Sequence, residues 1–237
     1  MLTVAILAGG LATRLRPMTE TVPKSLIEVN GEPFVAHQLR LLRASGVRRV
    51  VLCVGHLGGL VQRMIGDGSD FGLQVDYSFD GPALLGTAGA VRKALSKLGS
   101  SFFVMYGDSY LPCDYAAIAL NFEAAGVLGM MTVFRNEGKW DASNIEFETG
   151  KILAYSKTAR SPRMRYIDYG LGVFRAKAFG SLPLGAVCDL AALYSDLLQR
   201  HQLAAFEVSE RFYEIGSPAG LRETAEFLAA RRVNQEL

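Results

Sequence analysis

Leu7-Ala-Gly-Gly-Leu-Ala-Thr-Arg-Leu-Arg-Pro17 comes directly after an apolar run at residues 2–7. The β-branched content of that run and its abrupt end at two glycines predict a buried strand that leads into a tight loop. Gly9 and Gly10 have no Cβ, so a phosphate can approach their main-chain N–H groups closely. The stretch therefore predicts an anion-binding loop at the end of the first strand.

Three basic residues, Arg14, Arg16 and Lys24, lie just beyond the two glycines. The planar fork of arginine suits a polyphosphate better than a point charge does. The run is neither the dinucleotide-binding G-x-G-x-x-G nor a P-loop, because it lacks the Gly-Lys-Ser/Thr ending. A glycine turn followed by solvated basic residues is the alternative interpretation.

The chain as a whole has the composition of a compact protein. Its 237 residues are enough for one sizeable core, and its net charge of +2 is the small difference between 25 basic and 23 acidic residues. No charge block indicates a nucleic-acid tail or a membrane surface, and no apolar run approaches the length of a membrane span. The short first strand lacks the flanks of a signal peptide. We therefore expect a cytoplasmic protein, without nucleic-acid or membrane partners, in which the separated cysteines form neither a disulfide framework nor a zinc site.

Apolar runs with strand character alternate with stretches of helical spacing through the first part of the chain. The expected strands are residues 2–7, 48–54, 73–78, 102–106 and 129–134, and the expected helices are 35–46, 57–65, 84–98 and 114–125. Strands separated by helices at this spacing imply a mostly parallel sheet with helices on both faces. Farther on, residues 144–147 and 151–155 flank a Thr149-Gly150 turn and predict an antiparallel hairpin, and helices are expected at 191–199 and 221–230. The fold class is therefore α/β: a three-layer α/β/α, Rossmann-like, mixed but mostly parallel sheet with a small hairpin insertion. Ligands gather at the carboxyl ends of the strands in such sheets.

The stretch from Leu7 to Pro17, together with Pro23-Lys24, resembles the signature of the sugar-1-phosphate nucleotidylyltransferases. These enzymes join a nucleoside triphosphate to a sugar 1-phosphate and release pyrophosphate. The resemblance implies one catalytic domain over residues 1–237, with a nucleotide-binding half at about 1–135 and a sugar-phosphate-binding half at about 136–237. The nucleotide-binding residues that it implies in this stretch are Leu7, Ala8, Gly9, Gly10, Arg14 and Lys24.

Two later motifs extend the resemblance within the first half. Leu84-Leu-Gly-Thr-Ala-Gly-Ala-Val91 is similar to the family segment that contacts the nucleobase and ribose, which assigns Gly86 and Thr87 to nucleotide binding. A glycine-capped helix start with no ligand is the alternative there. Asp108 follows a buried strand and a glycine, and the resemblance makes it a Mg²⁺ ligand. Magnesium needs few protein ligands, since waters and substrate phosphates complete its shell.

The second half resembles the family more loosely. Lys157 lies in Ser-Lys-Thr where the family has Glu-Lys-Pro, so only the lysine that contacts the sugar phosphate is kept. Asp168 occupies the position of the family's asparagine in a strand that lines the sugar pocket, and Gly170 matches that strand's glycine. Glu214 stands where the family has an aspartate as second metal ligand. A solvated lysine is the alternative for Lys157.

The implied reaction brings two anions together, so charge neutralisation and positioning should supply most of the rate. The resemblance assigns Arg14 to the leaving pyrophosphate, Lys24 to the reacting phosphates, Lys157 to the sugar phosphate, and Asp108 with Glu214 to Mg²⁺, which makes Arg14, Lys24 and Asp108 the candidate catalytic residues. Two further hypotheses stay open: a cytidylyltransferase that acts on a non-sugar phosphorylated acceptor, and a catalytically inactive subunit that senses a nucleotide or sugar phosphate. A homo-oligomer is compatible with the sequence, which identifies neither the base nor the acceptor.

Overall fold

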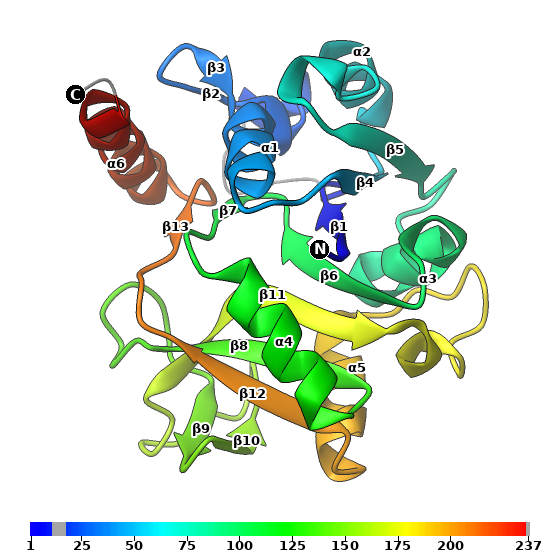
Figure 1. The fold of residues 1–237 in the computed structure, drawn as a ribbon, viewed down its shortest axis with the longest axis vertical. Coiled ribbons are helices and arrows are strands. Elements are labelled where there is room, and N and C mark those ends of the chain that lie inside the picture. The colour runs from blue at the N-terminus through cyan, green and yellow to red at the C-terminus, as the bar shows by residue number, and fades with distance from the viewer. Residues whose placement is uncertain (11–17, 236–237) are drawn as a thin grey trace.

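The computed structural model describes residues 1–10 and 18–235, and its centre is a nine-stranded mixed sheet (Figure 1). The strands of this sheet are β1 (Thr3–Leu7), β4 (Arg49–Val54), β5 (Gln74–Phe79), β6 (Ser101–Tyr106), β8 (Gly129–Arg135), β9 (Ile145–Glu148), β10 (Lys151–Tyr155), β11 (Tyr166–Arg175) and β12 (Leu203–Val208). They follow the order β10-β9-β11-β6-β1-β4-β5, and β8 pairs with both β11 and β12.

Helices cover both faces of the sheet. They are α1 (Phe34–Ala44), α2 (Gly58–Ile65), α3 (Gly86–Leu98), α4 (Tyr115–Ala125), α5 (Leu190–Gln199) and α6 (Pro218–Gln235). Two of them begin at an aspartate cap, because Asp114 accepts a hydrogen bond from the Ala117 N–H at 2.9 Å and Asp189 accepts one from the Ala191 N–H at 2.8 Å. These bonds satisfy amide groups that have no partner within the first turn.

Alternate residues of β1 face opposite helix layers, so the sheet separates the apolar core into two clusters. Val4 and Ile6 pack in one cluster with residues of α1, α2 and α4. Ala5, between them, packs in a second cluster with residues of α3 and α5. Side chains of a strand point alternately to the two faces, so a run that is apolar throughout must be covered on both sides. The expected three-layer α/β/α class is confirmed.

Four strands place their carboxyl ends along one edge of the sheet. β1 is parallel to β4 and β6, and β4 is parallel to β5. The segments that leave these strands at Ala8, Gly55, Asp80 and Gly107 consequently lie next to one another. This is the edge at which open α/β sheets bind ligands.

The other side of the sheet is antiparallel at its centre. β11 is antiparallel to both β6 and β8, and its pairing with β8 shifts register between Asp168 and Gly172. The predicted hairpin is present as β9 and β10, which continue the same sheet beyond β11. The sequence analysis did not foresee β12, which runs parallel to β8.

A smaller ladder joins the carboxyl-terminal region to the sheet edge. β7 (Ser109–Tyr110) pairs antiparallel with β13 (Tyr213–Glu214). Helix α6 follows β13, and it adjoins a third apolar cluster that includes Phe34 and Ile215. Another two-stranded ladder joins β2 (Glu28–Val29) and β3 (Glu32–Pro33). None of the described helices has the length and apolar character needed to cross a lipid bilayer.

Candidate active site

A cavity of about 380 Å³ opens at the carboxyl edge of β5, β4, β1 and β6. Most of the residues that the sequence assigned to nucleotide or metal binding in the first half contribute to its wall. The lining residues are Leu7, Ala8, Gly9, Gly10, Lys24, Ser25, Cys53, Asp80, Leu84, Gly86, Thr87, Ala90, Tyr106, Gly107, Asp108 and Gly216.

The two glycines after β1 form one wall of this cavity. The amides of Gly9 and Gly10 make no backbone hydrogen bond to any other described residue, which leaves both donors available. A Cβ on Gly9 would lie 3.1 Å from the Gly55 nitrogen, a tighter approach than side chains normally make. The absence of a side chain thus lets the chain pass close to the end of β4. Main-chain N–H groups in a glycine loop of this kind can bind an anion.

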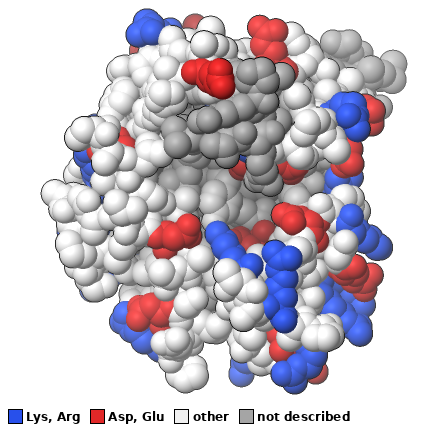
Figure 2. All heavy atoms as spheres, turned by 180° about the vertical axis from the view of Figure 1, so that it is seen from behind, with Lys and Arg blue, Asp and Glu red and all other residues white. Residues whose placement is uncertain are grey.

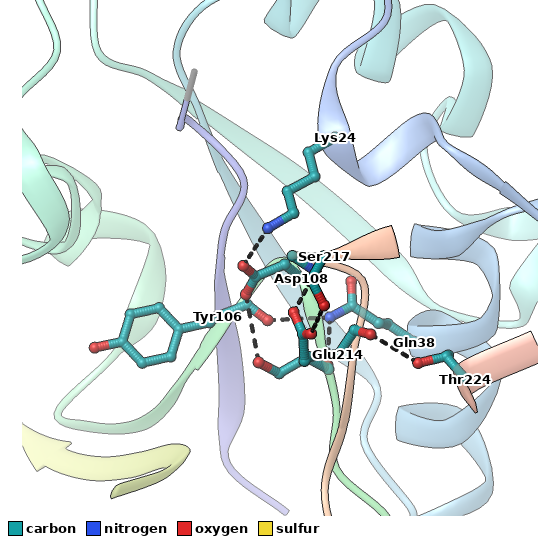
Figure 3. A network of polar contacts seen from close by, with 9 residues as sticks. Lys24, Gln38, Tyr106, Asp108, Glu214, Ser217 and Thr224 are labelled. Carbon is teal, nitrogen blue, oxygen red and sulfur yellow. Dashed lines mark hydrogen bonds and ion pairs between the residues drawn. The ribbon is translucent and has the colours of Figure 1, made fainter. Parts of the chain in front are cut away.

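Lys24 and Asp108 meet inside the cavity (Figure 3). Nζ of Lys24 lies 2.6 Å from Oδ2 of Asp108, and the two side chains are 16% and 33% exposed. A short 3-10 helix, Lys24–Leu26, begins at the lysine, and β6 ends just before Gly107-Asp108. Charge-assisted pairs of this kind are stronger than neutral hydrogen bonds.

The turn that carries Asp108 is held from two directions. The Gly107 amide donates to the Leu7 carbonyl at 3.0 Å, which ties the turn to β1. The side chain of Gln38, buried on α1, donates to the carbonyls of Tyr106 and Ser109 at 3.1 and 2.8 Å (Figure 3). The carboxylate is therefore presented from a fixed backbone rather than from a loose loop.

Glu214 lies beside this turn, and its carboxylate is bonded within its own segment. It pairs with Ser109 across the β13–β7 ladder, and the Ile215 amide donates to the Asp108 carbonyl at 3.0 Å. The glutamate side chain accepts hydrogen bonds from the Gly216 amide and from the Ser217 hydroxyl, the latter at 2.8 Å (Figure 3). These bonds brace the turn that precedes α6.

The chemistry of the donor set fits one hard divalent cation rather than an all-protein metal cage. Among the described residues, no three His, Cys, Asp or Glu side chains form a group that could hold a metal ion. Magnesium is bound by one or two carboxylates and substrate phosphates. Asp108 already attracts a cationic group, the Lys24 ammonium, and Glu214 comes from the neighbouring strand.

Gly86 and Thr87 lie at the start of α3, in the cavity wall. Gly86 has a φ of +71°, and a Cβ there would lie 2.4 Å from the Cys188 carbonyl oxygen, so glycine is required for two reasons. The Thr87 hydroxyl oxygen accepts a hydrogen bond from the Leu190 amide at 2.7 Å. Thr87 thus joins the start of α3 to the start of α5.

Lys157, Asp168 and Gly170 form a second polar region, which adjoins the cavity through Tyr106. Nζ of Lys157 lies 3.7 Å from Oδ1 of Asp189 and 5.9 Å from the centre of the Tyr106 ring. A Cβ on Gly170 would lie 3.5 Å from Cδ2 of Tyr106. Gly170, with a φ of +98°, donates its amide to Oδ1 of Asp168 at 3.0 Å.

Burial raises the pKa of the Asp168 carboxyl to about 6. The Gly170 amide and Lys157 oppose this rise, and Asp189 adds to it. Burial likewise raises the pKa of the Tyr106 and Tyr155 phenols, with Asp168 as a further cause. The hydroxyls of both tyrosines are buried and have no hydrogen-bond partner among the described residues.

Charge on the face seen in Figure 2 is mixed, with basic and acidic side chains interspersed. This distribution agrees with the near balance of 25 basic and 23 acidic residues. Because the surface charge is mixed, the positive potential of a phosphate-binding site must come from backbone amides and a few basic side chains at the site itself.

Comparison with known proteins identifies the family. Residues 3–143 match the family described as nucleotidyl transferase. The chain belongs to the nucleotidyl transferase family. The matched part contains the glycine loop, Lys24, the start of α3 and Asp108.

Curated relatives of this nucleotidyl transferase act on several bases and sugars. It is 27% identical over 224 residues to the N-acetylmuramate alpha-1-phosphate uridylyltransferase of Neisseria meningitidis. The alignment covers 92% of this chain and 94% of the relative. It is 28% identical over 201 residues to the UTP–glucose-1-phosphate uridylyltransferase of Synechocystis, covering 78% of this chain and 52% of the relative. Over 45% of its length it is 43% identical to the glucose-1-phosphate thymidylyltransferase of Streptomyces antibioticus, 30% of which is covered. The chain thus spans nearly the whole Neisseria relative but only about half of the Synechocystis one.

Solved structures share the fold. HddC from Yersinia pseudotuberculosis, in complex with GMP-PN, superposes with a TM-score of 0.80 at 22% identity, covering 96% of this chain and 100% of that chain. The inositol-1-phosphate CTP transferase of T. maritima superposes with a TM-score of 0.77 at 21% identity, covering 97% and 95%. These likenesses place the nucleotidyl transferase in the expected Rossmann-like class.

The sequence analysis identified only part of this nucleotidyl transferase site. Arg14 lies outside the described residues, so its predicted role stays a prediction. Asp80 and Tyr106 were not named individually, although base readout was expected near residues 74–89 and both residues follow or end strands at the same sheet edge as Gly9 and Asp108. Position at the carboxyl end of a parallel strand was the available signal for both.

Proposed function

We propose that this nucleotidyl transferase joins a nucleoside triphosphate to a sugar 1-phosphate, forming an NDP-sugar and releasing pyrophosphate in a Mg²⁺-dependent reaction. The Lys24–Asp108 pair in the cavity beside the glycine loop carries the proposal. The site offers amide donors, a cation and a carboxylate within one cavity at a sheet edge. The sugar-1-phosphate relatives support the acceptor class.

In this reaction an oxygen of the sugar 1-phosphate attacks the α-phosphorus, and pyrophosphate leaves from the opposite side. The Gly9 and Gly10 amides bind phosphate oxygens, and the Lys24 ammonium offsets the charge of the reacting phosphates. Arg14 is assigned to the leaving pyrophosphate. No covalent intermediate on the protein is required, because the acceptor phosphate is itself the nucleophile.

Asp108, with Glu214, would hold the magnesium ion. When bound, Mg²⁺ supplies charge neutralisation at the phosphates. Asp108 contributes from the cavity wall, whereas Glu214 must exchange at least one of its bonds to Gly216 or Ser217 to take part.

Lys157 binds the acceptor phosphate in this proposal. It lies over Tyr106, a residue of the cavity wall, and so extends the site toward the second half of the chain. Its ion pair with Asp189 is exposed and therefore weak, so an incoming phosphate can replace it.

A second acceptor class is equally compatible with the residues around Lys157. Lys157 is accompanied by two carboxylates, Asp168 and Asp189, where a purely phosphate-binding site needs none. A cytidylyltransferase that uses a non-sugar phosphorylated alcohol fits this polarity as well. The inositol-1-phosphate CTP transferase with the same fold is an example of such a reaction.

A pyrophosphate-release assay tests the proposal. Four nucleoside triphosphates are combined with hexose 1-phosphates, inositol 1-phosphate and phosphocholine in the presence of Mg²⁺. We expect release with one triphosphate and a hexose 1-phosphate, and a fall of at least about 100-fold in Arg14→Ala. Arg200→Ala is the matched control, since Arg200 pairs with Asp196 on α5 at 3.0 Å.

Two outcomes would contradict the sugar 1-phosphate reaction. Release with a non-sugar acceptor alone would select the second acceptor class. Binding of a triphosphate without release for any acceptor would favour a sensing subunit.

A further inference from the structure

A second cavity, of about 500 Å³, lies between two loops in the second half of the chain. The first loop, residues 136–144, joins β8 to β9, and the second, residues 156–165, joins β10 to β11. We call this cavity the arginine groove, and its lining shares no residue with the cavity beside the glycine loop. The arginine groove is lined by Glu137, Gly138, Ala142, Ser143, Arg160, Ser161, Pro162, Met164 and Arg165.

The first loop is organised around Asn136, which is fully buried. Its Nδ2 donates to the Asp141 carbonyl at 2.6 Å and to the Ser143 hydroxyl oxygen at 3.1 Å, and its Oδ1 accepts from the Trp140 amide at 3.3 Å. The Gly138 amide donates to the same hydroxyl oxygen at 3.2 Å. Because the Ser143 oxygen already accepts two hydrogen bonds, its O–H group is left as a donor, and no described residue accepts from it.

The second loop is held by a turn and by the first loop. The Met164 amide donates to the Ser161 carbonyl at 3.0 Å, across a turn whose second residue is proline, as such turns favour. The Arg165 carbonyl accepts from the amides of Asn136 and Glu137 at 3.1 and 2.8 Å, which joins the two loops. Backbone hydrogen bonds therefore fix both walls of the arginine groove.

Two guanidinium groups of the arginine groove are unpaired. Arg160 and Arg165 form neither an ion pair nor a side-chain hydrogen bond with any residue that the structure describes. Arg163 lies between them in the sequence but not in the wall, and it pairs with Glu146 at 3.3 Å. The Ser161 hydroxyl, in the wall, is buried and likewise has no partner among the described residues. A buried hydroxyl without a partner costs free energy until a ligand bonds to it.

The acidic residue of the wall does not cancel these positive charges. The carboxylate of Glu137 is already paired with Arg135 at 2.9 Å and lies 3.9 Å from Nζ of Lys139. A guanidinium group has five N–H donors and no acceptor, in a fork that matches phosphate and carboxylate oxygens. Two such groups with two hydroxyl donors suit an oxyanion and offer little to a cation.

We propose that the arginine groove binds a phosphate or carboxylate anion, at a site separate from the nucleotide cavity. Arg160 and Arg165 bind the oxygens of the anion, and the Ser143 and Ser161 hydroxyls donate to them. Arg160 follows Lys157 by three residues, a span of at most roughly 10 Å, so the groove lies on the acceptor side of the proposed active site. The anion is either free in solution or an acidic substituent of the acceptor, because both present the same oxygens.

Trp140 supplies a local signal for this binding, because it is the single tryptophan of the chain and lies in the first loop. Inorganic phosphate is titrated into the full chain at constant ionic strength while Trp140 fluorescence is followed. We expect a saturable change, with an affinity about 10-fold or more lower in Arg160→Gln and in Arg165→Gln, as for the loss of a hydrogen bond to a charged group. Arg163→Gln is the matched control, since Arg163 belongs to the same loop but not to the wall.

Lys24→Ala separates this signal from phosphate that binds in the nucleotide cavity. Lys24 lines the cavity beside the glycine loop and not the arginine groove. We therefore expect Lys24→Ala to leave the Trp140 titration unchanged, while Arg165→Gln weakens it.

A comparison of a hexose 1-phosphate with the hexose 1,6-bisphosphate identifies the source of the anion. Tighter binding of the bisphosphate, lost in Arg165→Gln but kept in Arg163→Gln, would assign the groove to an acidic substituent of the acceptor. Phosphate binding without such a gain would assign the groove to a free anion.

Two results would overturn the inference. The first is phosphate binding that is the same, by fluorescence and by calorimetry, in the unaltered protein, Arg160→Gln and Arg165→Gln. The second is loss of the Trp140 signal in Lys24→Ala but in neither arginine variant. Both leave the proposed function standing, because nucleotidyl transfer as proposed does not use the arginine groove.

Discussion

Nζ of Lys24 lies 2.6 Å from Oδ2 of Asp108, although 84 residues separate them in the chain. The pair joins the start of the 3-10 helix Lys24–Leu26 to the turn that follows β6, two segments that only the folded chain brings together. When a phosphate binds and Lys24 moves toward it, the Asp108 carboxylate loses its ammonium partner. Asp108 can then bind another cation, such as Mg²⁺, at the same oxygen. We therefore expect Lys24 to compete with Mg²⁺ for Asp108, although both residues contribute to the same reaction.

Removing either partner should slow catalysis, but the two changes should differ toward Mg²⁺. We expect Asp108→Asn and Lys24→Ala each to lower turnover at least about 100-fold, since each removes a charge from the reacting centre. Lys24→Ala should lower the Mg²⁺ concentration for half-maximal binding, because Asp108 loses its internal partner. Asp108→Asn should raise it. Measuring nucleotide affinity at increasing Mg²⁺ concentrations gives the Mg²⁺ requirement of each variant.

The matched control for this comparison is Lys139→Ala, whose side chain is 63% exposed and pairs with Glu137 at 3.9 Å. It should leave turnover and the Mg²⁺ requirement unchanged. Near wild-type turnover in Lys24→Ala would remove the lysine from the reacting centre.

Glu214 combines a structural bond pattern with a proposed metal role, and two substitutions separate them. Glu214→Gln keeps an acceptor and a donor for Gly216 and Ser217 but loses the charge. We expect it to melt within about 2 °C of the wild type while its Mg²⁺ requirement rises about 10-fold. Glu214→Ala loses the bonds too and should be destabilised by about 1–2 kcal/mol. Thermal melts and magnesium titrations of both variants decide; an unchanged Mg²⁺ requirement in Glu214→Gln would make this residue a brace for α6 alone.

The glycine before Asp108 is set by close packing against β1. A Cβ on Gly107 would lie 2.6 Å from the Leu7 carbonyl oxygen and 3.1 Å from the Ala8 Cα. Both contacts are backbone, which cannot turn aside, so Gly107→Ala should lower the free energy of unfolding by about 2 kcal/mol or more. Denaturant unfolding measures this loss.

Gly59→Ala supplies the contrast within the same chain. Gly59 lies in α2, and a Cβ there would meet only the Arg63 guanidinium, at 3.5 Å. Alanine in a helix should raise the free energy of unfolding by about 0.5–1 kcal/mol. Equal effects of the two substitutions would show that Gly107 is not sterically required.

The sequence predicts an element of the fold well when its apolar pattern is long enough to show a period. The long apolar strands, the helices between them and the hairpin at Thr149-Gly150 have clear periods and turn residues, and the structure contains all of them. β12 was missed because Leu203–Val208 contains only one β-branched residue and is half-buried along most of its length. The ladder of β7 and β13 has two residues on each side, too few for any period, yet it brings Glu214 beside the Asp108 turn.

The residues of the candidate site likewise fall into those that the sequence indicates and those that only the structure reveals. Gly9, Gly10, Lys24 and Asp108 could be found because they lie in one motif or directly after a strong strand, and they line one cavity. Asp80 has no motif around it. Its place in the cavity wall follows from its burial, and only the packing of Leu85 and the glycine loop reveals that burial.

Asp168 leads to a prediction about stability and pH. Its pKa is about 6 in the folded protein, because burial disfavours the charged carboxylate, against about 3.9 in an unfolded chain. The folded state thus binds this proton more tightly. The group's contribution to stability is fully present below about pH 4, falls as pH rises through 6, and is absent above it. At pH 7 to 8 the folded protein carries a half-buried charge at Asp168 that it would be more stable without.

Asp168→Asn should therefore stabilise the protein at pH 7 to 8 by on the order of 1 to 2 kcal/mol, and hardly at all near pH 4. The Asn oxygen can still accept the Gly170 amide bond of 3.0 Å, so the bulge in β11 is kept. Thermal melts from pH 4 to 8 should show the gain grow with pH, while Asp196→Asn, on the exposed side of α5, shows no such growth. A gain that is equal at all pH values would mean that the carboxyl group's packing, and not its charge, limits stability. If the gain at pH 7 to 8 is accompanied by weaker acceptor binding, the destabilising carboxylate is retained because it contacts the acceptor.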